Sequence, residues 1–168
     1  MTRARDVADS ALVHIATETF SAVASQSIND VFSADYNFYR LVFRIESKST
    51  TSSTFLRFRA SGTDNTSSEY AFGFIGRTPG TTTQIESNGT SAFILSTSND
   101  QSQTTSLDIS YPFQTGRTHI EGTIIQRTGN TGLGGGGQML VDTSYDGFTL
   151  LPSTGNITGT LSVYRYRK

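Results

Sequence analysis

The sequence predicts an all-β protein: an antiparallel two-sheet β-sandwich, jelly-roll-like, preceded by an N-terminal arm or short helix. Ser and Thr, 22 and 26 in number, fill 48 of the 168 positions, whereas Lys and Met number two each, so the chain is poor in residues that favour long helices. Short runs of alternating apolar and polar residues recur along it. Turn sequences such as Asn88-Gly89 and Asp146-Gly147 separate these runs, without the intervening helical patterns of a βαβ fold.

The clearest strand is expected at residues 36–46, where Tyr39, Leu41, Phe43 and Ile45 occupy alternate positions and therefore one face. The same alternation recurs elsewhere, and glycine-rich residues 129–137 are expected to be a loop. About ten short strands are expected in all, at residues 17–23, 26–32, 36–46, 54–61, 69–77, 91–96, 107–111, 118–127, 138–145 and 157–166.

The chain is expected to divide into an arm at residues 1–16 and a single β-sandwich domain at residues 17–168. Val7, Ala11, Leu12 and Ile15 would form one apolar stripe if residues 5–16 were a short helix. No clear capping residue begins that helix. The alternative is an extended arm that lies on another subunit.

The composition argues against several function classes. With 13 basic and 14 acidic residues the net charge is −1, so no nucleic-acid partner is expected. No apolar run approaches the roughly 20 residues of a membrane helix, and residues 1–9 do not resemble a secretory signal, so we expect no membrane insertion and synthesis in a cytoplasm. The sequence contains no Cys, and His14 and His119 lie far apart in it, so neither a metal site nor another cofactor is expected.

The motifs that carry chemistry in other proteins are weak here. Residues 132–137 satisfy G-x-G-x-x-G, but phosphate binding by that motif needs a strand before it and a helix after it. A mobile glycine loop at 134–137 is the better interpretation, since a strand is expected at 138–145. Acid pairs for glycoside hydrolysis, such as Glu121 and Asp142, are not distinguished from other pairs, and no G-x-S-x-G motif occurs. No catalytic residue is assigned.

Three stretches carry a resemblance to a known family: TRARDVA at residues 2–8, SINDVFSADYNFYRLV at residues 27–42 and ITGTLSVY at residues 157–164. Together they resemble β-sandwich, jelly-roll-like virion surface proteins and tail-fibre modules of tailed bacteriophages, especially marine and cyanobacterial phages. That family often has Gly after the last Tyr of the ending. Arg165 stands there in this chain, so we expect the last strand to continue through Tyr166 and Arg167.

The resemblance implies a non-enzymatic structural protein of the virion, with no catalytic residue to carry over. We expect a capsid decoration or cement protein, because the chain is one module without a heptad stem or repeat shaft. Its expected partners are copies of itself in a homotrimer, and the major capsid protein or other virion proteins. The alternative is a tail-fibre or receptor-binding module in which aromatic side chains bind host-surface glycans, the candidates being Tyr36, Phe38, Tyr70, Tyr111 and Tyr145.

Interface residues are expected in two places. The arm and its end contribute Arg3, Arg5, Val7 and Leu12, and exposed strand faces contribute Arg40, Arg44, Arg57 and Arg59. Arginine suits protein interfaces because its planar guanidinium pairs with carboxylates in a bidentate manner. One interpretation is a solvated face on which these arginines pair with Glu46, Glu69 or Glu121. The other is that the strands at 40–46 and 55–59 lie side by side and present one arginine-rich surface.

Overall fold

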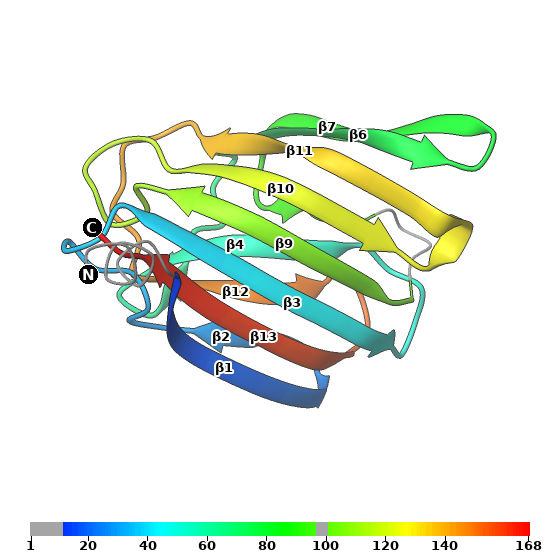
Figure 1. The fold of residues 1–168 in the computed structure, drawn as a ribbon, viewed down its shortest axis with the longest axis horizontal. Coiled ribbons are helices and arrows are strands. Elements are labelled where there is room, and N and C mark those ends of the chain that lie inside the picture. The colour runs from blue at the N-terminus through cyan, green and yellow to red at the C-terminus, as the bar shows by residue number, and fades with distance from the viewer. Residues whose placement is uncertain (1–11, 97–100) are drawn as a thin grey trace, which may run out of the picture.

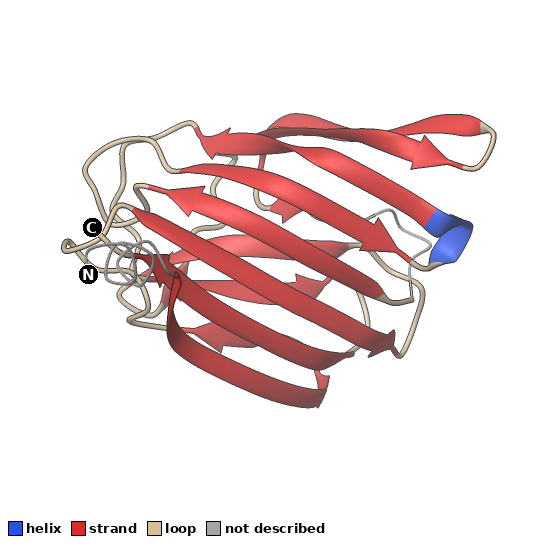
Figure 2. Ribbon diagram, in the orientation of Figure 1, coloured by secondary structure: helices blue, strands red, loops and turns tan. Residues whose placement is uncertain are grey.

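The computed structural model describes residues 12–96 and 101–168. Within these residues the chain forms strands and one short 3-10 helix, which confirms the predicted all-β sandwich (Figure 2). The elements are β1 (Leu12–Val23), β2 (Gln26–Ile28), β3 (Phe38–Lys48), β4 (Thr54–Ala60), β5 (Thr63–Asp64), β6 (Tyr70–Thr78), β7 (Thr81–Thr90), β8 (Phe93–Ile94), β9 (Gln103–Ser110), β10 (His119–Gln126), η1 (Thr128–Asn130), β11 (Thr131–Met139), β12 (Gly147–Pro152) and β13 (Ile157–Tyr166).

Two antiparallel sheets pack face to face (Figure 1). The large sheet has the strand order β1-β13-β3-β9-β10-β11-β6-β7, and the small sheet has the order β2-β12-β4-β5, with β8 also paired to β4. The quartets β1-β13-β3-β9 and β2-β12-β4-β8 form the two layers of a jelly roll, because the chain crosses repeatedly from one quartet to the other. Hairpins β6–β7 and β10–β11 extend the large sheet beyond β9.

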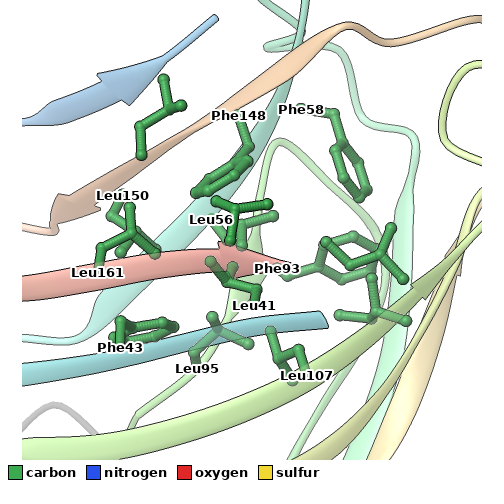
Figure 3. Packing of buried hydrophobic residues seen from close by; sticks show 14 of the residues in the cluster. Leu41, Phe43, Leu56, Phe58, Phe93, Leu95, Leu107, Phe148, Leu150 and Leu161 are labelled. Atoms are coloured by element: carbon green, nitrogen blue, oxygen red, sulfur yellow. The ribbon is translucent and has the colours of Figure 1, made fainter. Parts of the chain in front are cut away.

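The hydrophobic core lies between the sheets, and Figure 3 shows part of it. Leu41 and Phe43 of β3 and Leu161 of β13 come from the large sheet, while Leu56 of β4 and Leu150 of β12 come from the small sheet. Each of these side chains is at most 1% exposed. Burial of a side chain of this size stabilises the folded state by roughly 1.5–3 kcal/mol, so the alternating pattern of β3 fixes which face packs inward.

Aromatic rings fill the part of the core next to β4. The Phe58 ring stacks on Tyr145 at a centroid distance of 5.1 Å, and Phe93 meets Phe58 and Tyr70 edge to face at 5.9 and 5.0 Å. Tyr70 and Tyr145 are 0% and 1% exposed. The expectation that these two tyrosines could reach a glycan is therefore wrong, since both belong to the core.

The glycine-rich segment is a strand, so the predicted mobile loop at residues 134–137 is wrong. β11 pairs with β10 along one edge and with β6 along the other. Backbone hydrogen bonds on both edges hold the segment in place, although it has few side chains to pack. The strand predicted at 138–145 is also wrong, because β11 ends at Met139 and the next strand begins at Gly147.

Three of the β11 glycines, Gly135, Gly136 and Gly137, have no room for a side chain, and two of them face β6. A Cβ atom on Gly135 would lie 2.1 Å from the backbone oxygen of Gly73, and one on Gly137 would lie 2.5 Å from the backbone oxygen of Ala71. Both oxygens belong to β6, so any larger residue would push β6 away from β11. Gly134 is different, since the nearest atom to its Cβ position is 3.9 Å away.

The N-terminal boundary differs from the predicted one. Leu12 is the register partner of Tyr166, so residues 12–16 belong to β1 and to the sandwich, and a helix or free arm in that part is wrong. Residues 1–11, with Arg3, Arg5 and Val7, lie outside the described residues, and their predicted roles stay predictions. The last strand does continue past Arg165, as expected, but it ends at Tyr166 and does not include Arg167.

Candidate binding face

The outer face of the large sheet, which is the face turned away from the core, carries the main candidate site. The strand register aligns Arg40 of β3, Asp108 of β9, Glu121 of β10 and Gly136 of β11 in one row across the sheet. Directly opposed residues on one face of an antiparallel pair lie close enough to interact. This row therefore brings two carboxylates and one guanidinium together from three strands.

Arg40 and Asp108 form a bidentate ion pair. Arg40 Nε donates to Asp108 Oδ1 at 2.9 Å, and Arg40 Nη2 donates to Asp108 Oδ2 at 2.5 Å. The Tyr166 hydroxyl also donates to Asp108 Oδ1, at 2.7 Å. Burial by itself raises the pKa of Asp108, but the hydrogen bonds from Arg40 and Tyr166 outweigh burial and hold that pKa below its ordinary value. Asp108 is therefore ionised near neutral pH, and three hydrogen bonds occupy its carboxylate oxygens.

A hollow of about 250 Å³ lies beside this ion pair and is lined by Phe38, Asp108, Ser110, Glu121 and Tyr166. A second depression shares Asp108 and Glu121 with it and continues past Thr123 to Gly135. The hollow is bounded by aromatic rings near β3 and β13 and by a carboxylate on β10. Such a combination of apolar wall and few polar groups is typical of small-molecule sites.

Phe38 is an exposed aromatic residue at the rim of the hollow. Its side chain is 44% exposed and packs against Tyr111, which is 41% exposed, with ring centroids 5.2 Å apart and a tilt of 60°. Two large rings that remain open to solvent present apolar area that a partner can cover. Of the five aromatic candidates from the sequence, these two are the exposed pair.

The opposite end of the outer face is basic and apolar. Arg44, Ile125, Arg127 and Asn130 line a hollow of about 490 Å³ there. Ile125 is 57% exposed, and Ile75 on β6 is 59% exposed. Between β10 and β6 runs β11, whose Gly132 and Gly134 stand opposite Ile125 and Ile75 respectively. The two isoleucines thus flank a strip of sheet that has almost no side chains.

The small sheet carries the other predicted arginines on its own outer surface. Arg59 on β4 pairs with Asp64, donates from Nε to Asn29 Oδ1 at 2.9 Å, and donates from Nη1 to Thr149 Oγ1 at 2.8 Å. It also donates to the backbone oxygen of Gly62. Arg59 is therefore held by a polar network in which several neighbouring segments meet.

The idea of one joint arginine surface is wrong. Arg40 and Arg44 lie on β3 in the large sheet, whereas Arg57 and Arg59 lie on β4 in the small sheet, and the two strands do not pair. Since the inward faces of β3 and β4 meet in the core, their arginines point to opposite sides of the sandwich. The interpretation of paired arginines is closer, but the partners of Arg40 and Arg59 are Asp108 and Asp64 instead of the expected glutamates.

The remaining predicted residues are spread over the molecule. His119 is exposed on β10, and His14 on β1 hydrogen-bonds Thr17 at 2.8 Å. Leu12 is 37% exposed at the start of β1. At the same end, the Arg165 guanidinium carbon lies 4.0 Å from the centroid of the Tyr36 ring, a cation–π contact.

The sequence does not predict Asp108 or Tyr166 as site residues. A signal existed for Asp108, since it occupies an outward position of the predicted strand 107–111. That position faces Arg40 only once the order of strands is known, because the two residues are distant in sequence.

No three side chains of His, Cys, Asp or Glu in residues 12–96 and 101–168 gather as ligands for a metal ion. The same part of the chain contains no helix of the length and apolarity needed to cross a bilayer.

Comparison with known proteins shows no family. No family model matches the chain, and no curated protein matches it. One solved structure, titled "Crystal Structure of A. japonicus CB05", is similar with 12% sequence identity and a TM-score of 0.33, over 99% of this chain and 28% of that chain. This chain thus spans less than a third of that protein, and a likeness at this score carries no argument about fold or function.

Proposed function

We propose that this protein is a non-enzymatic structural protein of a tailed-bacteriophage virion, a capsid decoration or cement protein that assembles as a homotrimer. The proposal starts from the sequence resemblance of residues 2–8, 27–42 and 157–164. The structural observation that supports it is the basic and apolar end of the outer face. Ile125 is more than half exposed there and lines the same hollow as Arg44, and Ile75, which is equally exposed, lies across the side-chain-free strip of β11.

This end of the face has the composition of a protein contact surface. Exposed isoleucines bring apolar area that is lost from water on association, and arginine is the cation enriched at interfaces. The glycines of β11 leave the backbone surface flat, so another flat surface can approach closely. The partner in this proposal is the major capsid protein or a neighbouring copy of the chain.

The test uses virions of the phage that encodes the chain. Particles stripped of this protein are incubated with the purified wild type, with Ile75→Ser/Ile125→Ser, or with Arg57→Ser as a control on the opposite sheet. Occupancy is measured by quantitative mass spectrometry against the major capsid protein, and the mass of the free protein by sedimentation. Lower occupancy or loss of trimers for the double variant, with an unchanged melting temperature, supports the proposal. Absence of the protein from purified particles refutes it.

A second candidate function is a tail-fibre or receptor-binding module that recognises host-surface glycans. The observation that favours it is the exposed Phe38–Tyr111 pair beside the hollow with Asp108 and Glu121. Copy number separates the two candidates: a number comparable to that of the major capsid protein favours the head, and a handful of copies favours the tail. Blocking of phage adsorption to host cells by the purified protein would favour receptor binding.

A further inference from the structure

We propose that the hollow between Phe38, Tyr166 and Glu121 is a binding site for a single neutral sugar ring. This inference rests on the second candidate function and deepens it, because it assigns the site and the chemical class of the ligand. The size of the hollow fits that class. At about 250 Å³ it lies just below the roughly 300–1,000 Å³ typical of pockets for drug-sized ligands, so it suits one ring and not a larger compact ligand.

The aromatic wall supplies the apolar half of the site. A pyranose ring has one face of C–H groups, and such a face packs on an aromatic ring and removes apolar area from water. Phe38 is the ring that both lines the hollow and stays 44% exposed. Tyr111 packs against Phe38 and limits its movement, so the Phe38 ring is already positioned before a ligand arrives.

The polar half of the site consists of groups whose hydrogen-bonding capacity is free. Asp108 has its carboxylate taken by Arg40 and Tyr166. Glu121, by contrast, makes no hydrogen bond or ion pair with any residue that the structure describes, and it lies on the exposed face of β10. A carboxylate accepts strong hydrogen bonds from hydroxyl groups, and two adjacent sugar hydroxyls can donate to its two oxygens.

Ser110 completes this set. Its hydroxyl lines the same hollow and can both donate and accept. The hollow therefore offers more hydrogen-bond acceptors, from Glu121, than donors, of which the Ser110 hydroxyl is one. A ligand rich in hydroxyl groups, which can donate to these acceptors, fits this set. Binding is directed by these groups, whereas Arg40 stays in its ion pair.

The charge of the hollow selects among sugars. The charges of Arg40 and Asp108 cancel in their ion pair, so Glu121, the register neighbour of Asp108, gives the hollow its net negative charge. A uronate, sialate or sulfate group would meet like charge there. The site is therefore expected to bind neutral hexoses or N-acetylhexosamines and to reject their acidic counterparts.

The test is an array of neutral hexose and N-acetylhexosamine oligosaccharides printed beside uronate-containing, sialylated and sulfated ones, probed with the full chain. Hits are quantified by titration calorimetry with the free oligosaccharide. We expect neutral glycans to bind, and Phe38→Ala and Glu121→Gln each to weaken binding about tenfold or more. A matched control on the same face, Glu86→Gln, is expected to bind as the wild type does.

Phe38→Leu guards against misfolding of the Phe38→Ala variant. Phe38→Leu keeps an apolar side chain but removes the ring, so it should weaken binding while the melting temperature stays unchanged. The proposal is overturned if no neutral oligosaccharide binds, if acidic glycans bind better, or if the folded Phe38 variants bind normally. If the protein binds sugar at this hollow but the Phe38 variants do not change phage adsorption, the sugar site is supported and the receptor-binding function is refuted.

Discussion

The hydroxyl of Tyr70 in β6 accepts a hydrogen bond from the backbone N–H of Phe58 in β4, at 3.1 Å. The same hydroxyl donates to the backbone oxygen of Asn65 at 2.8 Å. Because β6 belongs to the large sheet and β4 to the small one, this single phenol links the two layers from within the aromatic core. Its surroundings also make ionisation unfavourable, since burial raises the pKa of Tyr70 above its ordinary value.

Tyr70→Phe is expected to lower the free energy of unfolding by about 1–3 kcal/mol, because the Phe58 N–H loses its buried partner. Urea unfolding at neutral pH measures this, with Tyr111→Phe as the exposed control. A raised folded-state pKa means that the wild type keeps this contribution below about pH 10 and loses it as the pH rises further. The variant should therefore lose less stability than the wild type on going to alkaline pH. Equal alkaline losses would show that ionisation of Tyr70 is not linked to unfolding.

Gly135→Ala and Gly134→Ala both replace a glycine of β11, but only the first adds a Cβ that would meet the backbone of β6. Comparing them separates the effect of this steric overlap from the effect of losing a glycine. The Cβ of Ala at position 135 would overlap the backbone oxygen of Gly73, so β6 and β11 must move apart, and we expect destabilisation of about 1–3 kcal/mol or more. Ala at position 134 would make only an ordinary van der Waals contact, at 3.9 Å from the backbone oxygen of Gly122, and should change stability by less than about 0.5 kcal/mol. Thermal melts followed by circular dichroism make the comparison. Similar melting temperatures for the two variants would contradict the close packing of β11 on β6.

Asp108→Asn tests the ion pair with Arg40. The folded-state pKa of Asp108 is depressed, so its contribution to stability is present above the unfolded value of about 4 and is lost as the pH falls through the lower folded value. The wild type should therefore lose stability below about pH 4 more steeply than the variant. The effect is small, about 1 kcal/mol or less, because the pair is partly exposed to water. Parallel acid profiles of the melting temperature would show that the pair does not couple to folding.

Arg59→Ser and Arg44→Ser distinguish a structural arginine from a contact arginine. Arg59 holds Asp64, Asn29 and Thr149 together, so its removal should cost about 1–3 kcal/mol in unfolding free energy. Arg44 lies exposed at the basic end of the outer face, and its removal should leave the melting temperature within about a degree of the wild type. Binding to stripped virions is expected to fall for Arg44→Ser. If Arg44→Ser unfolds the protein and Arg59→Ser does not, both assignments are wrong.

The strands that the sequence predicts best have one face buried in the core and the other exposed to solvent. β3 and β13 fall at or near their predicted bounds because their apolar residues alternate cleanly. β12 was missed because Thr149 is buried together with Phe148 and Leu150, so no alternation marks the strand. β11 was missed because glycine has no side chain from which a period can be read, although neighbouring strands satisfy its backbone on both edges.

The candidate site depends on strand order, which local sequence does not encode. Phe38, Asp108, Glu121 and Tyr166 come from β3, β9, β10 and β13, and each is unremarkable within its own strand. They meet because β3 lies between β13 and β9 in the large sheet. For the same reason, the interpretation that places the arginines of β3 and β4 on one surface is wrong: consecutive strands of a jelly roll lie in different sheets.

The pairing of Leu12 with Tyr166 has a practical consequence for engineering. The first and last strands of the described domain are neighbours, so the polypeptide enters and leaves the sandwich at a single point. A unit with this geometry can be spliced into an exposed loop of a carrier protein, or circularly permuted by joining its ends with a short linker, without stretching the chain across the fold. The two ends of the described domain thus lie together, at the same end of the outer face as Phe38.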